Sequence, residues 1–379
     1  MIVDLDANAS LRPSFSLGER LLAEWSRLGN PSAVHRLGQQ SRATVERGRY
    51  AIRKLLNLSV HDRVVFTSGA TEANNLALYC LSKREGRIVS SSIEHPCILE
   101  PLKRLSHSGR SLCLVKPTTY GEIVPQSVLE AIDTETSFIS IMAANNETGV
   151  INDLKGIASQ IRSQSESIII HTDAAQLCGK SFVDFQDLGV DLLTLSGHKM
   201  GALSGVGALV VREGYEVEPL VLGGPQEEKV RGGTENVLGI LSMALVVEEL
   251  IETLAHRIQT MKTARDYFEE RIIADVSGIK INSLECPRLP NTSSIYVEGV
   301  RADDLLVALD LEGIMVSTGA ACSSGKIDPS HVLLEMGRSE TEARSTIRVS
   351  FRGDEDRKLV DYVVPIFERA VARMRANEL

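Results

Sequence analysis

The sequence lacks the features that mark membrane, secreted and nucleic-acid-binding proteins. None of its apolar runs approaches the length needed to cross a bilayer, and the first residues, MIVDLDANAS, show neither the basic start nor the apolar stretch of a signal peptide. The 41 lysines and arginines are outnumbered by 50 aspartates and glutamates, which gives a net charge of −9 and disfavours a surface for nucleic-acid phosphates. We therefore expect a cytoplasmic protein that binds neither a membrane nor nucleic acid directly.

Paired cysteines are absent as well. The six cysteines include no Cys-x-x-Cys spacing, so we expect no metal site, and structural disulfides are rare in cytosolic proteins. Five of them lie in apolar or mixed surroundings and are expected to be small core or surface residues: Cys80, Cys97, Cys113, Cys178 and Cys286. Cys322 differs, because its segment, STGAACSSGKIDPSH, lacks the apolar side chains that anchor a loop. An accessible thiol of this kind can reach the thiolate form and act as a nucleophile.

Internal repeats, low-complexity runs and linkers are also missing, and the 379 residues are enough for two or three domains. Between Val64 and Val211 strand-like runs alternate with helical patterns such as 72–81 and 156–163. The runs are RVVFT, RIVSSS, SLCLVK, SFISIMA, SIIIHT, DLLTLS and GALVV. This alternation predicts an α/β fold with a mainly parallel seven-stranded sheet and helices on both faces.

The texture of the chain changes at about Asn236. The next forty residues have helical periodicity and no proline, which predicts long helices that join two domains. Short strands (KINS, SSIYV, TIRVSF) and two helices, 302–311 and 357–376, follow them. This composition predicts a smaller α+β domain.

Three segments of the first part carry chemistry. Lys199 follows the run DLLTLS, at the strand end where α/β sheets collect ligands, and a partly buried lysine there can form a Schiff base with an aldehyde. Asp173 ends the run IIIHTD, and 67–75 (TSGATEANN) opens a helix whose N–H groups and hydroxyls could cradle a phosphate. A solvated lysine, a helix N-cap and an ordinary helix start are the simpler alternatives. Together, however, these are the parts of a pyridoxal phosphate (PLP) enzyme.

Eight motifs in chain order carry a resemblance to a known family: GNPSAVHRLG, TSGATEANN, SSIEHP, ANNETGV, HTDAAQ, SGHK, RGGTEN and STGAACSSGKIDPSHVL. The sequence resembles the group I cysteine desulfurases, the type used in nitrogen fixation and iron–sulfur assembly, over nearly its whole length. The resemblance implies the fold of fold-type I PLP-dependent transferases. It also implies a large PLP-binding domain at 15–258, and a small domain at 1–14 and 259–379 that carries the cysteine loop.

The resemblance also assigns roles to single residues. Lys199 would hold PLP and then move the Cα proton, Asp173 would pair with the pyridinium nitrogen, and His95 would stack on the ring. Asn146 and Gln176 would bind the phenolic oxygen. The phosphate would be held by Ala70, Thr71, Ser196 and His198, and by Thr234 of a partner subunit in a homodimer. Arg348, assisted by Asn30, would bind the substrate carboxylate.

Several of these residues have simpler alternatives. His95 could be a surface histidine, Asn146 a turn residue, Thr234 the N-cap of the helix that follows, and Arg348 an exposed arginine on an edge strand. The chain also departs from the family's pattern at a few positions. These are the residues Gly201, Ala202 and Leu203 after Met200, Pro225 before RGGTEN, and Asn8 and Ser10 near the N-terminus.

The implied function is a PLP-dependent cysteine desulfurase that converts L-cysteine to L-alanine and leaves a persulfide on Cys322 for a sulfur-acceptor protein. A selenocysteine lyase, another small PLP lyase or an aminotransferase of the same fold is the alternative within enzymes, and a non-catalytic scaffold is the alternative outside them. Only 57 residues follow Cys322, fewer than in housekeeping members that dock an iron–sulfur scaffold. We therefore expect a dedicated acceptor, for example in tRNA thiolation, DNA phosphorothioation or a local iron–sulfur pathway.

Overall fold

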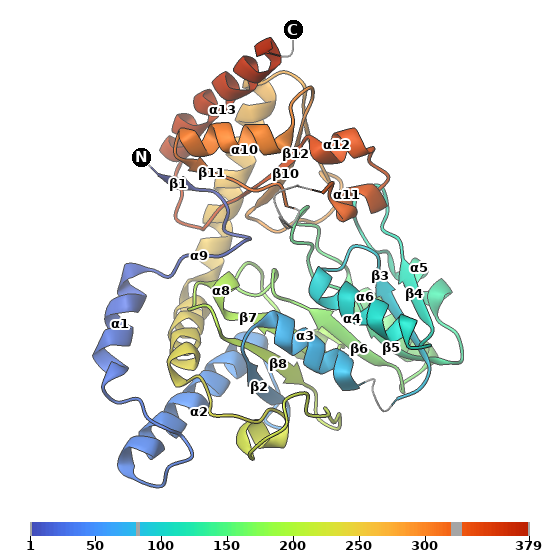
Figure 1. Ribbon diagram of the computed structural model, residues 1–379, viewed down its shortest axis with the longest axis vertical. Coiled ribbons are helices and arrows are strands. Elements are labelled where there is room, and N and C mark those ends of the chain that lie inside the picture. The colour runs from blue at the N-terminus through green and yellow to red at the C-terminus, as the bar shows by residue number, and fades with distance from the viewer. Residues whose placement is uncertain (1, 81–83, 320–327, 378–379) are drawn as a thin grey trace.

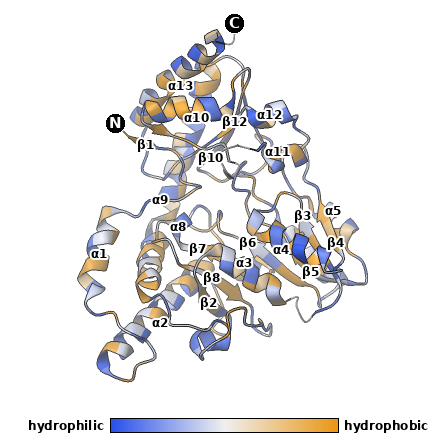
Figure 2. Ribbon diagram, viewed as in Figure 1, coloured by the Kyte–Doolittle hydropathy of each residue, from blue (hydrophilic) through white to orange (hydrophobic). Residues whose placement is uncertain are grey.

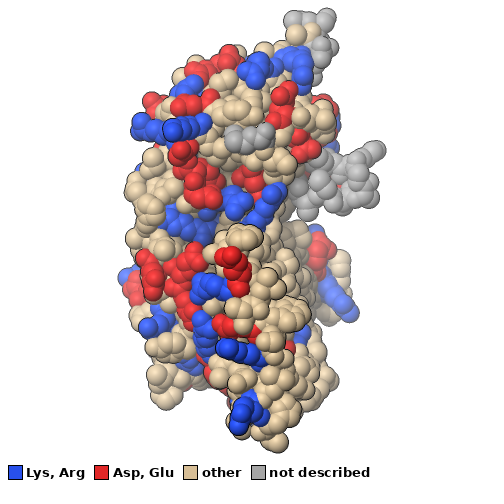
Figure 3. Space-filling model, turned by 90° about the vertical axis from the view of Figure 1, so that its left-hand side faces the viewer, with Lys and Arg blue, Asp and Glu red and all other residues tan. Residues whose placement is uncertain are grey.

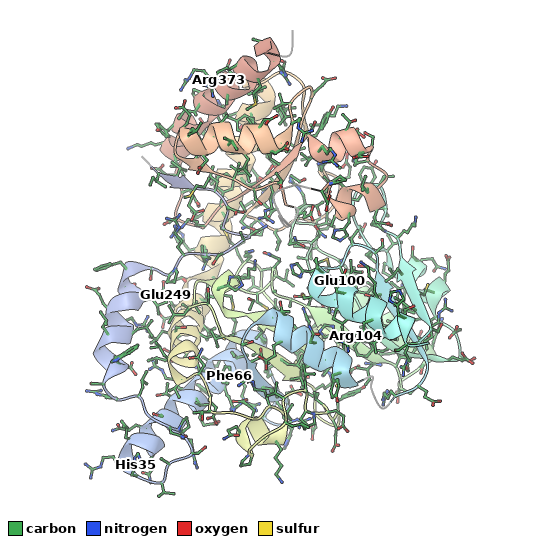
Figure 4. All side chains as sticks on the ribbon, viewed as in Figure 1. His35, Phe66, Glu100, Arg104, Glu249 and Arg373 are labelled. Carbon is green, nitrogen blue, oxygen red and sulfur yellow. The ribbon has the colours of Figure 1, made fainter. Side chains whose placement is uncertain are left out.

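The computed structural model describes residues 2–80, 84–319 and 328–377, and its elements form two units stacked along the long axis of the molecule (Figure 1). The lower unit in this view holds a large sheet with helices around it, and the upper unit holds the C-terminal strands and helices. His35 and Arg373 lie toward opposite ends of this axis (Figure 4).

The sheet of the lower unit has seven strands. In spatial order they are β2 (Arg63–Thr67), β8 (Gly207–Val211), β7 (Leu192–Ser196), β6 (Ile169–Asp173), β5 (Thr136–Ser140), β3 (Arg87–Ser91) and β4 (Leu112–Val115). β8 runs antiparallel to both of its neighbours, and the other neighbouring strands pair in parallel. The predicted mainly parallel sheet of seven strands is confirmed.

Helices cover both faces of this sheet because alternate residues of each strand point to opposite sides. On β7, Leu193 and Leu195 belong to the core on one face, and Leu192 belongs to the core on the other. The first core includes residues of α2 (Arg36–Leu56), α5 (Pro125–Ala131) and α6 (Leu154–Gln164), and the second includes residues of α3 (Ala70–Tyr79) and α4 (Pro96–His107). Figure 2 shows the hydrophobic colour along the central strands, while the helices carry both colours.

The upper unit has a core of its own. It is built from β9 (Ile279–Ile281), β10 (Thr292–Val297), β12 (Thr346–Ser350), α10 (Ala302–Leu311) and α13 (Arg357–Asn377). Val3 of β1 (Val3–Asp4) and Leu5 belong to the same core, and β1 pairs in parallel with β11 (Ile314–Met315). The N-terminal segment therefore packs with C-terminal elements, while the domain boundary near residue 258 stays a prediction.

One helix connects the two units. The region predicted to form long helices is a single helix, α9 (Val237–Asp275), which contributes Leu250 to the lower core and Phe268 to the upper one. Its N-cap is Asn236, whose side chain accepts a hydrogen bond from the N–H of Gly239. The alternative that Thr234 caps this helix is therefore wrong, because the N-cap position lies two residues after Thr234.

Shorter elements complete the described chain. They are α1 (Phe15–Trp25), α7 (Phe185–Leu188), α8 (Gly197–Met200), the 3-10 helix η2 (Gln226–Lys229), α11 (His331–Glu335) and α12 (Glu340–Arg344). Among the described helices, none is both long and apolar enough to cross a membrane.

Candidate active site

A cavity of about 600 Å³ lies at the end of the sheet where β6 and β7 finish, and the upper unit contributes part of its wall. Ten residues singled out from the sequence line it: Ala70, Thr71, His95, Asn146, Asp173, Gln176, Ser196, His198, Lys199 and Arg348. They come from segments far apart in the chain, so the fold brings the predicted site together. Crevices at the carboxyl ends of parallel strands are where α/β proteins bind their ligands.

Lys199 lies on α8, immediately after β7. Its Nζ donates hydrogen bonds to the backbone carbonyls of Asn8 at 2.6 Å and Ala9 at 2.9 Å. Burial, followed by the nearby charge of Arg348, lowers the pKa of Lys199 to about 8. More of the free amine is therefore present near neutral pH than for an exposed lysine, and free amine is the form that attacks an aldehyde.

Asp173 is the last residue of β6 and is buried. Oδ1 accepts the N–H of Ala175 at 2.9 Å, and Oδ2 accepts a hydrogen bond from Asn74 Nδ2 at 2.7 Å. No helix follows Asp173, so the alternative that it is a helix N-cap does not hold. These two donors hold the carboxylate in one orientation at the cavity wall.

His95 is the N-cap of α4, and its ring faces the same cavity. Its Nδ1 accepts the backbone N–H of Cys97 at 3.2 Å, so the neutral ring carries its proton on Nε2. Burial lowers the pKa of His95, and the charge of Asp173 opposes that shift. His95 therefore lines the cavity, and in its neutral form it offers Nε2–H as a donor.

Cys97 is a site residue that the sequence did not single out. Its Sγ lies 2.9 Å from His95 Nδ1 and 3.8 Å from Asp173 Oδ2, and it lines the cavity. The only signal was its position in the first turn of a helix, two residues after His95. Burial raises the pKa of the Cys97 thiol to about 12, so it is a neutral neighbour of Asp173.

The predicted phosphate site lies where α3 begins. The first N–H groups of a helix lack intrahelical partners and favour anions. Ser196 Oγ is fully buried and has no hydrogen-bond partner among the residues that the structure describes. Burial, followed by the charge of Lys199, lowers the pKa of His198 to about 4. Gly207 allows the backbone of Gly69, just before α3, to approach β8 closely, because a Cβ at residue 207 would lie 2.7 Å from that backbone.

Arg348 lies on β12, which is an edge strand, yet only 6% of its side chain is exposed. It donates to Asp6 Oδ1 at 2.7 Å and to the carbonyl of Asn146 at 2.9 Å. The alternative of an exposed edge arginine is wrong, because the N-terminal segment covers this edge through Asp6. Its guanidinium is a fixed cation at the cavity, and its Nε has no partner in the described part of the chain.

Two described residues among the predicted ones, Asn30 and Thr234, do not line the cavity, and a third predicted residue is not described. Asn30 is exposed, and its side chain accepts the N–H of Ser32. Thr234 is exposed and lies three residues before Val237, the first residue of α9. Cys322 lies outside the described residues, although Gly319, the last described residue before it, lines the cavity. The roles of these three residues stay predictions.

The cavity residues fit PLP. Lys199 supplies the amine for its aldehyde, Asp173 a carboxylate for its ring nitrogen, and the orphaned hydroxyl of Ser196 together with the start of α3 a site for its phosphate. The described residues contain no group of three or more His, Cys, Asp or Glu that could hold a metal ion.

Comparisons with known proteins agree with this site. The family model for aminotransferase class-V matches residues 19–363. The chain is 36% identical over 353 residues to the cysteine desulfurase IscS of Dictyoglomus turgidum, covering 92% of this chain and 89% of that protein.

Solved structures resemble the chain in the same way. A NifS-like protein superimposes with a TM-score of 0.91 at 31% identity, covering 98% of this chain and 100% of the other. A structure described as SspA in complex with cysteine has a TM-score of 0.81 at 31% identity, with coverage of 94% and 100%.

Proposed function

The chain belongs to the aminotransferase class-V family and is a PLP-dependent cysteine desulfurase, and from this premise we propose how its residues divide the work. The observation that carries the proposal is the meeting of Lys199 and Asp173 at one cavity with a buried cation, Arg348. The relative solved with cysteine supports L-cysteine as the substrate. A lyase acting on selenocysteine, an aminotransferase or a non-catalytic scaffold has no comparable support.

Bound PLP supplies an electron sink for the pair released at the substrate's Cα. Asp173 keeps the ring nitrogen protonated, since its carboxylate is held ready by Asn74 and Ala175. Lys199 takes up and returns the Cα proton, because its lowered pKa leaves it able to act as a base near neutral pH. His95 contributes a neutral ring whose Nε2–H can donate at the cavity.

Arg348 binds the carboxylate of L-cysteine. A guanidinium meets a carboxylate through two parallel hydrogen bonds, which fixes the orientation of the substrate as well as its position. The contacts to Asp6 and to the carbonyl of Asn146 hold the guanidinium in one place before the substrate arrives. Asn30 is proposed to assist Arg348 in binding the carboxylate, although it does not line the cavity in the single chain.

Cys322 is the proposed nucleophile. Its thiolate attacks the sulfur of the bound cysteine, the carbon–sulfur bond breaks, and alanine leaves while the sulfur stays on Cys322 as a persulfide. The support is the Gly-, Ala- and Ser-rich segment around Cys322 and the cavity-lining position of Gly319 just before it. The persulfide then passes to an acceptor protein. A reduced thiol is required, which favours a cytoplasmic setting.

A homodimer is the proposed active unit. Large apolar side chains are exposed on and around α1, notably Phe15 at 84%, Leu22 at 75% and Trp25 at 59%. The other face of α1 packs on α9 through Leu17 and Leu21, so the exposed side is left for a partner. In this unit Thr234 of one chain is proposed to reach the phosphate of the other.

A dedicated sulfur acceptor is the least constrained part of the proposal. Its support is the departure of the segment Met200–Leu203 and of Pro225 from the family's pattern, since these residues follow Lys199 and precede the Thr234 loop. A pathway such as tRNA thiolation, DNA phosphorothioation or local iron–sulfur assembly would use such an acceptor.

Lysine 199 provides the test of the site. The purified protein with PLP is expected to show the absorbance of a covalently bound cofactor, and Lys199→Ala is expected to lose that band and the formation of alanine from L-cysteine. Lys155→Ala, at an exposed lysine on α6, is the matched control and should keep both. A Lys199→Ala protein that keeps borohydride-trappable cofactor and full alanine production would overturn the assignment.

A further inference from the structure

Lys180 is a buried lysine that pairs with no carboxylate among the described residues. Its side chain is only about 2% exposed, and it forms no ion pair within the described chain. Nζ donates to Asn8 Oδ1 at 2.8 Å and to Gln176 Oε1 at 2.5 Å. Burial, followed by the charges of Lys199 and Arg348, lowers the pKa of Lys180 well below its usual value. Both acceptors of Nζ are amide oxygens, one from Asn8 and one from Gln176.

These contacts determine which way the amide of Gln176 faces. Its Oε1 faces Lys180, while its Nε2 donates to the backbone carbonyl of Asn8 at 3.0 Å. If the amide were turned over, its oxygen would face the Asn8 carbonyl and no proton would lie between the two acceptors. Because an amide nitrogen carries two N–H groups, one donor of Gln176 remains, and it has no other partner in the ranges described.

The amide of Asn8 is fixed by the same network. Its Nδ2 donates to Thr292 Oγ1 at 2.9 Å and also contacts the carbonyl of Asn146, so its Oδ1 faces Lys180. The backbone carbonyl of Asn8 also accepts from Lys199 Nζ. Lys180 is therefore the common donor beneath two residues, Asn8 and Gln176, that line the cavity.

The local backbone brings Lys180 back toward Gln176. Both residues belong to the turns that follow β6, and Gly179 between them has φ of +80°, in the left-handed region that glycine adopts without strain. Lys180 lines neither the cavity nor the surface. Lys180 therefore makes no direct contact with a molecule bound in the cavity.

We propose that Lys180 is a positioning residue that holds the Gln176 amide so that its remaining N–H faces the ring oxygen of the bound cofactor. This inference rests on the proposed role of Gln176. A donor at that oxygen stabilises its negative charge. It thereby lowers the pKa of the nearby nitrogen through which Lys199 would hold the cofactor. The pH midpoint of the cofactor's absorbance change therefore reports on the Gln176 amide.

The test is a pH titration of that absorbance in Lys180→Met, which keeps the length of the side chain and removes its donors. The midpoint is expected to rise by about one pH unit, the size of one lost charge-assisted hydrogen bond. In a Gln176→Leu background, Lys180→Met is expected to add no further shift, because the amide it holds is gone. The control is Lys155→Met, an exposed lysine paired with Asp187, which should leave the midpoint unchanged.

Each other outcome has a distinct meaning. Equal shifts in both backgrounds would show that Lys180 acts through its charge, and would overturn the inference. A shift in Gln176→Leu with none in Lys180→Met would also overturn it, while the proposed role of Gln176 would stand. No shift in either variant would contradict both the inference about Lys180 and the proposed role of Gln176. The absorbance of the bound cofactor would still identify the protein as a PLP enzyme. If Lys180→Met does not fold, Lys180→Gln, which keeps a polar group at the site, is titrated and judged by the same outcomes.

Discussion

A buried histidine at the centre of the sheet makes stability depend on pH. His171 is fully buried on β6, where Nδ1 lies 2.9 Å from Ser140 Oγ and Nε2 lies 3.2 Å from Thr194 Oγ1. Burial lowers its pKa to about 3. The unfolded chain binds a proton at this residue below about pH 6.5 while the folded chain does not, so stability falls as the pH drops from about 6.5 toward 3.

His171→Gln should therefore lose less stability on acidification than the wild type. Between pH 7 and pH 5, the free energy of unfolding measured with urea is expected to fall by roughly 2 kcal/mol more in the wild type than in His171→Gln. This is the effect of one proton taken up on unfolding over about 1.5 pH units below about pH 6.5. His61→Gln, at an exposed position, is the control and should follow the wild type. Equal acid sensitivity of His171→Gln and wild type would contradict the assignment.

The cation at the substrate site is the second test at this scale. Arg348→Lys keeps the charge but removes the planar fork, so KM for L-cysteine should rise about tenfold or more while kcat changes much less. Arg352→Lys, four residues along the same segment and outside the cavity, is the matched control. A fall in kcat at unchanged KM would show that Arg348 does not bind the substrate in its ground state.

At the scale of elements, the start of α9 distinguishes two roles that the sequence allowed for Thr234, helix capping and phosphate binding, because Asn236 is the cap. Asn236 caps the helix through Gly239, and its Nδ2 also donates to the carbonyl of Gly205 at 2.9 Å. Asn236→Ala is expected to lower the free energy of unfolding by about 1 kcal/mol. Thr234→Ala should change it by less than about 0.5 kcal/mol, because Thr234 is exposed and caps nothing. Denaturant midpoints of the two variants that rank in the opposite order would contradict this division.

The elements that could be predicted are those with a strong internal signal. Buried strands such as β6 and β7 read as continuous apolar runs, and α10 was bounded correctly because its periodicity is clear. The pair β1 and β11 could not be predicted, because each strand has two residues and the pairing depends on contacts over three hundred residues apart. Asn236 was missed because three polar residues precede α9, and local sequence does not decide which of them caps it.

At the scale of the whole molecule, contacts between distant segments determine which site residues can be predicted from the sequence. Nine of the ten predicted residues at the cavity lie at or after the carboxyl ends of strands in the large sheet, where the topology brings them together. The burial of Arg348 could not be read from its strand, since it depends on the N-terminal segment through Asp6. Cys97 and Lys180 were missed because their spacing to His95 and Gln176 has a role only in the folded chain.

Figure 3 shows basic and acidic side chains interspersed on one face, without a broad basic field. On α9, Glu249 lies beside α1 (Figure 4) and reaches Arg20 at 3.8 Å, which ties α1 and its exposed apolar side to the lower unit.

Mixing two inactive chains tests the proposed homodimer. If Thr234→Ala alone is severely impaired, combining it with Lys199→Ala should restore activity, because one site of each mixed dimer then holds Lys199 from one chain and Thr234 from the other. Random exchange of chains predicts recovery of about a quarter of wild-type activity. Mixtures that form dimers by mass yet remain inactive would contradict a shared site.

The most direct test of the central claim follows the sulfur atom itself. The PLP-loaded enzyme is incubated with L-cysteine in the absence of any acceptor, and free alanine is quantified. The mass of the peptide that contains Cys322 is then measured by mass spectrometry under non-reducing conditions. The account predicts alanine together with a gain of one sulfur atom on Cys322, and neither sulfur gain nor sustained alanine formation in Cys322→Ser. Alanine formed at the wild-type rate by Cys322→Ser, with no added sulfur on Cys322 in the wild type, would contradict it.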